Sequence, residues 1–139
     1  MQHNTEVYAI RLKPGDDLQQ GILQLVKEKQ IRAGWIAAAV GSVTRYSIRF
    51  ANQPDASKGE GHFEIVSLSG TVSSNGSHLH IAISDSTGAT IGGHLMEGCI
   101  IYTTAELVIA STDKYEFTRA KDGTTPWEEL RVEEKGGKR

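Results

Sequence analysis

Two histidines separated by one residue, His78 and His80, are the residues of this sequence whose type and spacing most favour metal chemistry. In a β-strand, residues two apart point to the same face, so both imidazoles can reach one point in space. Imidazole binds zinc, copper, iron and nickel, and three histidines with an open fourth position are a recognised pattern for catalytic zinc. A third histidine, His94, lies farther along the chain.

The hydrophobic pattern predicts that His94 shares the face of His78 and His80. Leucine and isoleucine alternate with the first two histidines, and Ile91 and Leu95 stand on the face opposite His94 if the second segment is also a strand. A one-residue slip would turn a whole set of side chains to the other face, so burying the apolar sets together fixes the register. The three imidazoles should therefore share one face.

The length of the turn between the two strands decides which histidines are neighbours. A five-residue loop that pairs Ser84 with Thr90 would place His94 directly opposite His80, and a three-residue loop would place it opposite His78. Loops of both lengths are ordinary for hairpins.

Two alternatives to a shared site remain open at this stage. A bulge at Gly92–Gly93 would break the alternation, since glycine pairs often mark one, and strand histidines often simply face solvent. The twin glycines also leave room beside His94 for a ligand or a backbone that approaches closely.

Carboxylates that could assist a metal are Glu64 and Glu97, either as a further ligand or as a second group that orients one. Each has a plainer alternative, because Glu64 would be solvated if its strand face points outward and Glu97 precedes a glycine in an expected turn. The single cysteine, Cys99, excludes an internal disulfide and a cysteine-based zinc site, and it lies beside a long apolar run that predicts burial.

Length and charge bound the remaining possibilities. A chain of 139 residues is enough for one compact domain, expected at 5–133, followed by a flexible charged tail at 134–139. With 15 Lys+Arg against 17 Asp+Glu, the formal net charge is −2, which excludes a surface that binds phosphate everywhere. The start lacks a signal-peptide layout and no apolar run approaches the roughly 20 residues of a membrane span. We therefore expect a cytoplasmic protein with no membrane partner.

Periodicity predicts an α+β fold with one mostly antiparallel sheet of about seven strands. The clearest helix follows Asp16, the expected N-cap, and repeats Leu18, Ile22, Leu25 and Val26 on one side. Strands are expected at 7–12, 35–40, 44–51, about 63–68, on both sides of the turn 85–88, at 100–110 and at 115–119, with Trp127, Leu130 and Val132 docking a last segment. Neither a G-x-S-x-G elbow nor a nucleotide-binding glycine motif occurs.

Three segments together resemble a known family. They are Gly61–Gly70 (GHFEIVSLSG), Gly76–Ile81 (GSHLHI) and Gly92–Leu95 (GGHL), with Ala39–Ser42 upstream. They are similar to the PPC domain (plants and prokaryotes conserved), also called the domain of unknown function 296, and the likeness covers roughly residues 6–119. The resemblance implies a single α/β domain with an antiparallel sheet and flanking helices, assembled as a homotrimer.

The resemblance also implies functional expectations. Plant members follow AT-hook segments in nuclear DNA-associated proteins, prokaryotic members carry a DNA-binding label, and the histidine triplet matches His78, His80 and His94. This chain has no Arg-Gly-Arg-Pro hook, the element that inserts arginines into the minor groove. Its one dense basic stretch is 135–139.

Two functions therefore stay open. One is a homotrimeric regulatory module associated with DNA. The other is a metal-dependent enzyme or small-ligand protein that uses His78, His80 and His94, with Glu64 or Glu97 as a base or supporting group. Both accommodate one divalent metal ion per subunit, with zinc as the first candidate.

Overall fold

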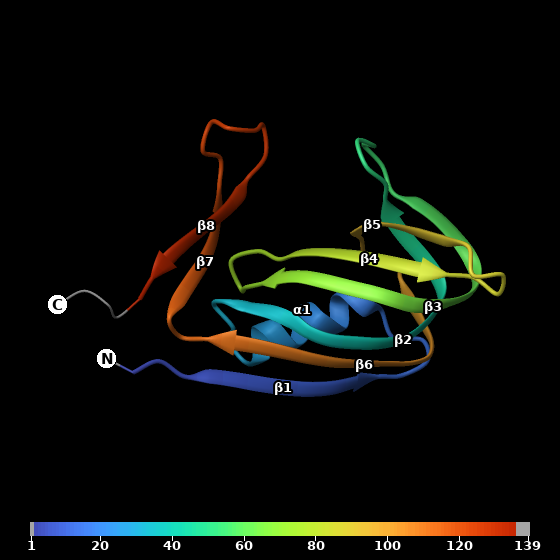
Figure 1. Ribbon diagram of the computed structural model, residues 1–139, viewed down its shortest axis with the longest axis horizontal. Coiled ribbons are helices and arrows are strands. Elements are labelled where there is room, and N and C mark those ends of the chain that lie inside the picture. Colours follow the sequence, from blue (N-terminus) through green and yellow to red (C-terminus); the bar gives the residue numbers. More distant parts are fainter. Residues whose placement is uncertain (1, 136–139) are drawn as a thin grey trace.

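The computed structural model describes residues 2–135. One helix and eight strands follow one another in this part of the chain (Figure 1): β1 (Thr5–Leu12), α1 (Leu18–Glu28), β2 (Gly34–Arg49), β3 (Ser57–Val72), β4 (His78–Ser84), β5 (Thr90–Leu95), β6 (Ile100–Thr112), β7 (Tyr115–Ala120) and β8 (Glu129–Glu134). At 11 residues, α1 is too short to cross a membrane, and the described residues contain no longer helix.

Six of the strands form one antiparallel sheet in the order β1-β6-β2-β3-β4-β5. The end of β2 also pairs with β5, through Ile48 opposite Leu95 and Arg49 opposite His94. Because β2 pairs with β3 as well, the run from β2 to β5 closes on itself. This closure brings the end of β2 beside the strand that carries His94.

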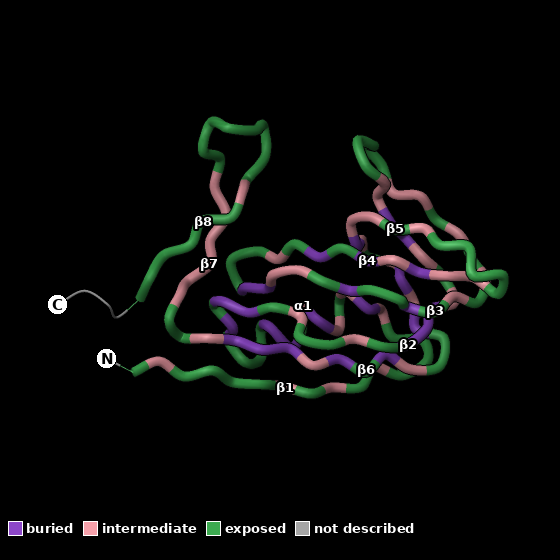
Figure 2. Tube along the Cα trace, in the orientation of Figure 1, coloured by how far each residue is buried: buried purple, intermediate pink, exposed green. Residues whose placement is uncertain are grey.

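The core lies between α1 and one face of this sheet, and Figure 2 shows buried positions on the helix and on the strands around it. The helix forms there because its apolar residues recur at helical spacing, so one side of it is covered by the sheet. The buried residues of α1 are the four expected from the sequence: Leu18, Ile22, Leu25 and Val26. Burying such side chains is worth roughly 1.5–3 kcal/mol each relative to exposure.

The start of the helix differs from expectation by one residue. Asp17, rather than Asp16, is the N-cap, and its side chain accepts a hydrogen bond from the backbone N–H of Gln20. Asp16 instead accepts from the backbone N–H of Lys13 at 2.8 Å, within the preceding turn. Two adjacent aspartates both satisfy the sequence rule for a cap, so the turn geometry decides between them.

Two strands expected at 35–40 and 44–51 are one continuous strand, β2. The break expected between these two strands is only an irregularity, a shift in the register of β2 against β6 between Gly41 and Val43. A Cβ at Gly41 would lie 2.2 Å from the Thr104 carbonyl oxygen, so glycine permits the close approach of the two strands there. The end of a strand predicted here is wrong, because the structure has only a local irregularity in the pairing of β2 with β6.

The last two strands correct the expectation of a single sheet. β7 and β8 pair only with each other and form a second sheet that projects from the first (Figure 1). Trp127 is 68% exposed and Val132 55%, so the expected docking of this segment on the core is wrong. The hairpin is attached through the Phe117 carbonyl, which accepts from Ser73 Oγ at 3.0 Å and Asn75 Nδ2 at 2.9 Å.

The expected tail at 134–139 lies largely outside the described residues. Glu134 is the final residue of β8, opposite Tyr115.

Candidate metal centre

The β4–β5 hairpin has the register that a five-residue loop predicts. Ser84 pairs with Thr90, and His80 lies directly opposite His94. The ladder runs without a register shift through Gly92–Gly93, so the bulge considered from the sequence does not occur. The turn is held by Asp85, whose carboxylate accepts from the backbone N–H groups of Thr87 and Ala89. This turn therefore fixes which histidines face each other.

The three histidines meet on the face of the sheet that points away from the core. One ligand nitrogen from each ring can be chosen so that His78, His80 and His94 all lie within 4.8 Å of one another. The Nε2 atoms of His78 and His80 are 3.2 Å apart. The ring of His94 is centred 5.2 Å from that of His78 and 5.9 Å from that of His80. The rings therefore converge on one region of the surface.

Burial of the alternating apolar residues holds the histidines in this position. Leu79 and Ile81 are 3% and 2% exposed, so β4 cannot rotate without bringing them into water. On β5, Leu95 is 1% exposed beside His94. The cluster is thus a consequence of the core on the opposite face.

The twin glycines of β5 serve close backbone approach. A Cβ at Gly93 would lie 2.5 Å from the Arg49 carbonyl oxygen, and one at Gly92 would lie 2.8 Å from the Ile81 carbonyl oxygen. These glycines therefore let β5 fit between β4 and β2. The Gly92–Gly93 pair noted in the sequence is therefore explained by the close packing of the strands.

Burial keeps two of the imidazoles neutral. Desolvation, followed by the charge of Arg49 and then the other two histidines, lowers the pKa of His94 to about 4. Desolvation is also the main cause that lowers the pKa of His78, with His80 and Arg119 adding to it. A neutral imidazole carries the free lone pair that a metal requires.

A cavity of about 960 Å³ adjoins the cluster and is lined by His78 and His94. Arg49 and Arg119 line it from β2 and β7, and Glu129 lines it from β8. The negative charge of Glu129 raises the pKa of His78, although the lowering effects prevail. The projecting hairpin thus supplies both signs of charge next to the histidines.

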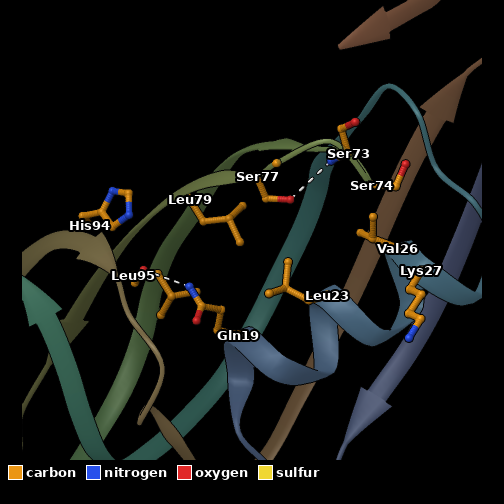
Figure 3. Close-up of a pocket in the computed structure, with 11 residues that line it drawn as sticks. Gln19, Leu23, Val26, Lys27, Ser73, Ser74, Ser77, Leu79, His94 and Leu95 are labelled. Carbon is orange, nitrogen blue, oxygen red and sulfur yellow. Dashed lines mark hydrogen bonds between the residues drawn. The ribbon is translucent and has the colours of Figure 1, made fainter. Parts of the chain in front are cut away.

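A second hollow of about 510 Å³ lies on the helix side (Figure 3). Leu23, Leu79 and Leu95 form its apolar wall, and His94 stands at its edge. The Gln19 amide donates to the Leu95 carbonyl oxygen at 3.3 Å and so ties α1 to the end of β5. This hydrogen bond therefore fixes the end of β5, the strand that carries His94, against α1.

The two carboxylates expected from the sequence lie elsewhere. Glu64 pairs with Ser84, at the opposite end of β4 from His78, and lines a different hollow with Tyr102. Glu97 is exposed in the turn after β5. Neither lines the two cavities that contain His94. Cys99 is fully buried, as the apolar run beside it predicts.

Three residues near the site, Arg49, Arg119 and Glu129, were not predicted from the sequence. Arg49 reaches the site because β2 pairs with β5, and no local pattern announces a pairing between distant strands. Arg119 and Glu129 reach it because β7 and β8 project as a hairpin. The alternating segment before Ala120 and the one after Trp127 were a usable signal for that hairpin, but not for its position.

Similar proteins agree with this architecture. The family model for the Plants and Prokaryotes Conserved (PCC) domain matches residues 2–113. A hypothetical protein from Salmonella enterica is 37% identical, with a TM-score of 0.93 over 97% of this chain and 98% of its own. A metal-containing protein from Archaeoglobus fulgidus is 28% identical, with a TM-score of 0.76 over 91% of this chain and 93% of its own.

Two other comparisons concern longer or more distant proteins. The bifunctional protein GlmU of a Synechococcus strain is 42% identical over 127 residues, which are 91% of this chain and 20% of that protein. The chain therefore spans about a fifth of the length of this curated relative. An AT-hook motif nuclear-localized protein of Arabidopsis thaliana is 31% identical over 99 residues, 67% of this chain and 22% of its own.

The histidine face, the closed run of strands and the matched residues lead to one assignment: the chain belongs to the Plants and Prokaryotes Conserved (PCC) domain family.

Proposed function

We propose that this protein binds one divalent metal ion per subunit through His78, His80 and His94, with zinc as the preferred ion. The observation that carries the proposal is the convergence of three imidazole nitrogens within 4.8 Å of one another. Two zinc–nitrogen bonds of about 2.0–2.1 Å can bridge nitrogens up to roughly 4 Å apart, so small side-chain adjustments suffice.

The donor set fits a borderline-soft divalent ion. The pKa of His78 is lowered and that of His94 is lowered to about 4, mainly by burial, which favours the unprotonated rings that a metal requires. Three neutral ligands leave the positive charge of the ion uncompensated and leave a coordination position for a further group. A metal in such a site supplies Lewis acidity. The metal-containing relative from Archaeoglobus fulgidus supports the proposal.

Elemental analysis of purified protein tests this function. We expect about one equivalent of zinc per chain in the wild type and a loss of most of it in His80→Ala. His62→Ala is the matched control, because His62 lies on β3 stacked against Tyr102, outside the cluster. Equal metal content in the wild type and in His80→Ala, after zinc loading and gel filtration, would contradict the proposal.

We further propose that the subunits assemble as a homotrimer through the sheet face that points away from α1. Paired positions on β1, β6 and β2 share that face and carry small or apolar side chains, including Ala9 and Ala38. Val7 and Val40 are 62% and 56% exposed there, and Trp35 is 38% exposed. Contiguous exposed apolar surface of this kind marks association sites. Light scattering should give three times the chain mass of 15.1 kDa, about 45 kDa.

DNA association is a second candidate, supported by the names of relatives. A protein from Bacteroides thetaiotaomicron with this fold has a provisional DNA-binding assignment, as does one from Ralstonia eutropha. The formal charge of −2 weighs against a strong interaction. Titration of duplex DNA at two salt concentrations tests it, and binding that weakens with salt is the result expected of a phosphate-contacting protein.

A further inference from the structure

Two arginines flank the histidine cluster through the pairing of the strands. Arg49 lies directly opposite His94 in the β2–β5 pair, and directly opposed residues share a face of the sheet. Arg119 donates from Nη2 to Thr71 Oγ1 at 3.2 Å, and Thr71 lies directly opposite His78 in the β3–β4 pair. One guanidinium is thus placed beside His94 and the other beside His78.

Both guanidiniums have hydrogen-bonding capacity left over. A guanidinium carries five N–H donors. Arg49 donates to the Gln53 carbonyl oxygen at 3.4 Å, and Arg119 to Thr71. Among residues 2–135 neither arginine forms an ion pair with a carboxylate, whereas Arg32 and Arg45 do. Both are half-buried and both line the cavity of about 960 Å³.

Two of the residues that line this cavity, Trp127 and Pro54, offer apolar surface. Trp127 lines it from the loop before β8, and Pro54 lines it from the loop between β2 and β3. The backbone N–H of Trp127 donates to Thr125 Oγ1 at 3.2 Å, and that hydroxyl donates to Glu129 Oε2 at 2.7 Å. The indole, which is 68% exposed, therefore stands at the rim of the cavity on an ordered turn. Exposed aromatic side chains on ordered loops commonly serve as contact surfaces.

The charges of the cavity favour a small anion over a long one. Two guanidiniums attract a single anionic group, and a divalent ion held by the histidines would add to this attraction. Glu128 and Glu129 line the hairpin side, and a nucleic-acid backbone that crossed the cavity would bring further phosphates against these carboxylates. A small molecule can place its anionic group between the arginines and keep the rest of its surface away from both glutamates.

We propose that this cavity binds a small organic anion whose carboxylate or phosphate group is held by Arg49 and Arg119 and whose apolar part lies against Trp127. The inference deepens the proposed metal-binding function, because the anionic group would sit next to the histidines that hold the ion. It names the class of ligand for the site: a small carboxylate or phosphate monoester that carries a planar or apolar portion.

Isothermal titration calorimetry with two probes tests the inference on the zinc-loaded full chain. Inorganic phosphate reports on the anion-binding groups without Trp127, and benzoate reports on those groups together with Trp127. Because either anion can also bind the open position of a zinc ion, the titration on metal-free protein separates the arginines from the metal. We expect Arg49→Gln and Arg119→Gln each to lower the affinity for both probes about tenfold, since each removes one cationic partner of the anion. Trp127→Ala should weaken benzoate several-fold and leave phosphate unchanged. Arg45→Gln, on the same strand as Arg49 but paired with Glu60 outside the cavity, is the matched control and should bind both probes as the wild type does.

The controls separate this inference from the metal proposal. Zinc content, measured on the same samples, should be unchanged in all four variants. A wild type that holds no zinc would contradict the proposed metal site and leave the anion site untouched. The anion titration is then repeated on metal-free protein. There too, Arg49→Gln and Arg119→Gln should bind both probes more weakly than the wild type does. Binding of neither probe, or equal binding by the wild type and both arginine variants, would overturn the inference. A third outcome would favour a nucleic acid: neither probe binds, but duplex DNA binds in a salt-sensitive way that Arg49→Gln and Arg119→Gln abolish. This outcome would also overturn the inference.

Discussion

His94 lies between His80 on one side and Arg49 on the other, each directly opposite it in a strand pair. This double pairing exists because β5 is bonded both to β4 and to the end of β2. The two imidazoles, which we propose bind a metal, and a cationic side chain are thereby placed in one row across the sheet. The arrangement of these side chains therefore depends on the close approach of β5 to β4 and to β2, which Gly92 and Gly93 permit.

Gly70 is the position where this dependence is most easily tested. It lies opposite Leu79, between the partners of His78 and His80, with φ +140°. A Cβ there would lie 2.0 Å from the His78 carbonyl oxygen. Gly70→Ala should therefore force β3 and β4 apart and lower the free energy of unfolding by about 2–4 kcal/mol, from backbone strain and overpacking together. Urea denaturation measures the loss, and zinc content should fall with it.

The matched control is Gly88→Ala in the β4–β5 turn. Gly88 also has positive φ, +85°, but a Cβ there would meet no heavy atom within 4 Å. This variant should lose only the backbone term, about 1–2 kcal/mol. Equal destabilisation of the two variants would show that the contact with β4 does not matter.

The stability of the metal-free protein should fall as the pH falls from about 6.5 to about 4. Burial and the charge of Arg49 lower the folded pKa of His94 to about 4, from the 6.5 of an unperturbed imidazole. Within that window the unfolded chain binds more protons at this residue than the folded chain, so the free energy of unfolding decreases as protons are added. His94→Gln removes this titration and should give a flatter dependence between pH 7 and pH 4.5. Urea midpoints across that range measure it, and parallel curves for the two proteins would contradict the assignment.

The histidine face was predictable from sequence because two independent periodicities agree there. Leu79, Ile81 and Ile83 must be buried, so His78 and His80 must point outward. The turn chemistry of Asp85 then sets the register of the next strand. The local pattern was sufficient to predict the shared face, but it left two turn lengths open, and the structure selects the one that places His94 opposite His80.

The rest of the site depends on contacts between distant segments. The position of Glu64 follows from a long strand, β3, whose register could not be derived from its own alternation because of the irregularity between Ile65 and Ser67. Arg49 and the β7–β8 hairpin are placed by packing between segments far apart in the chain. Periodicity describes which face a residue occupies and leaves its distance from another element undetermined.

The cap of α1 offers a test of local stability. Asp17 accepts from the backbone N–H of Gln20 at 3.0 Å and from that of Gly98 at 2.7 Å, so it ties the helix start to the turn after β5. Asp17→Ala should cost about 1–3 kcal/mol, from the lost cap and an unpaired N–H. Asp16→Ala should cost less, because Asp16 serves one exposed turn N–H. Thermal or urea denaturation compares the two, and a larger loss in Asp16→Ala would contradict this assignment of the cap.

Cys99 should be inert in the native protein. Its side chain is fully buried, and burial raises the pKa of the thiol to about 11. Because the thiolate is the reactive species, a chromogenic disulfide reagent at pH 8 should label the native chain far more slowly than the urea-unfolded chain. Labelling at the same rate in both states would show that the residue is accessible.

Val40 tests the proposed trimer face. It lies on β2 opposite Glu106 of β6, is 56% exposed, and points away from α1. Val40→Glu would place a second carboxylate beside Glu106 at the proposed interface, where burying two neighbouring like charges is strongly unfavourable. Light scattering should therefore show a shift from about 45 kDa toward the 15.1 kDa of a single chain. Val132→Glu, which adds the same charge at a 55% exposed position on β8, should leave the mass unchanged. If the wild type is already monomeric, or if Val40→Glu keeps the wild-type mass, this face is not the contact, and its exposed apolar residues need another explanation.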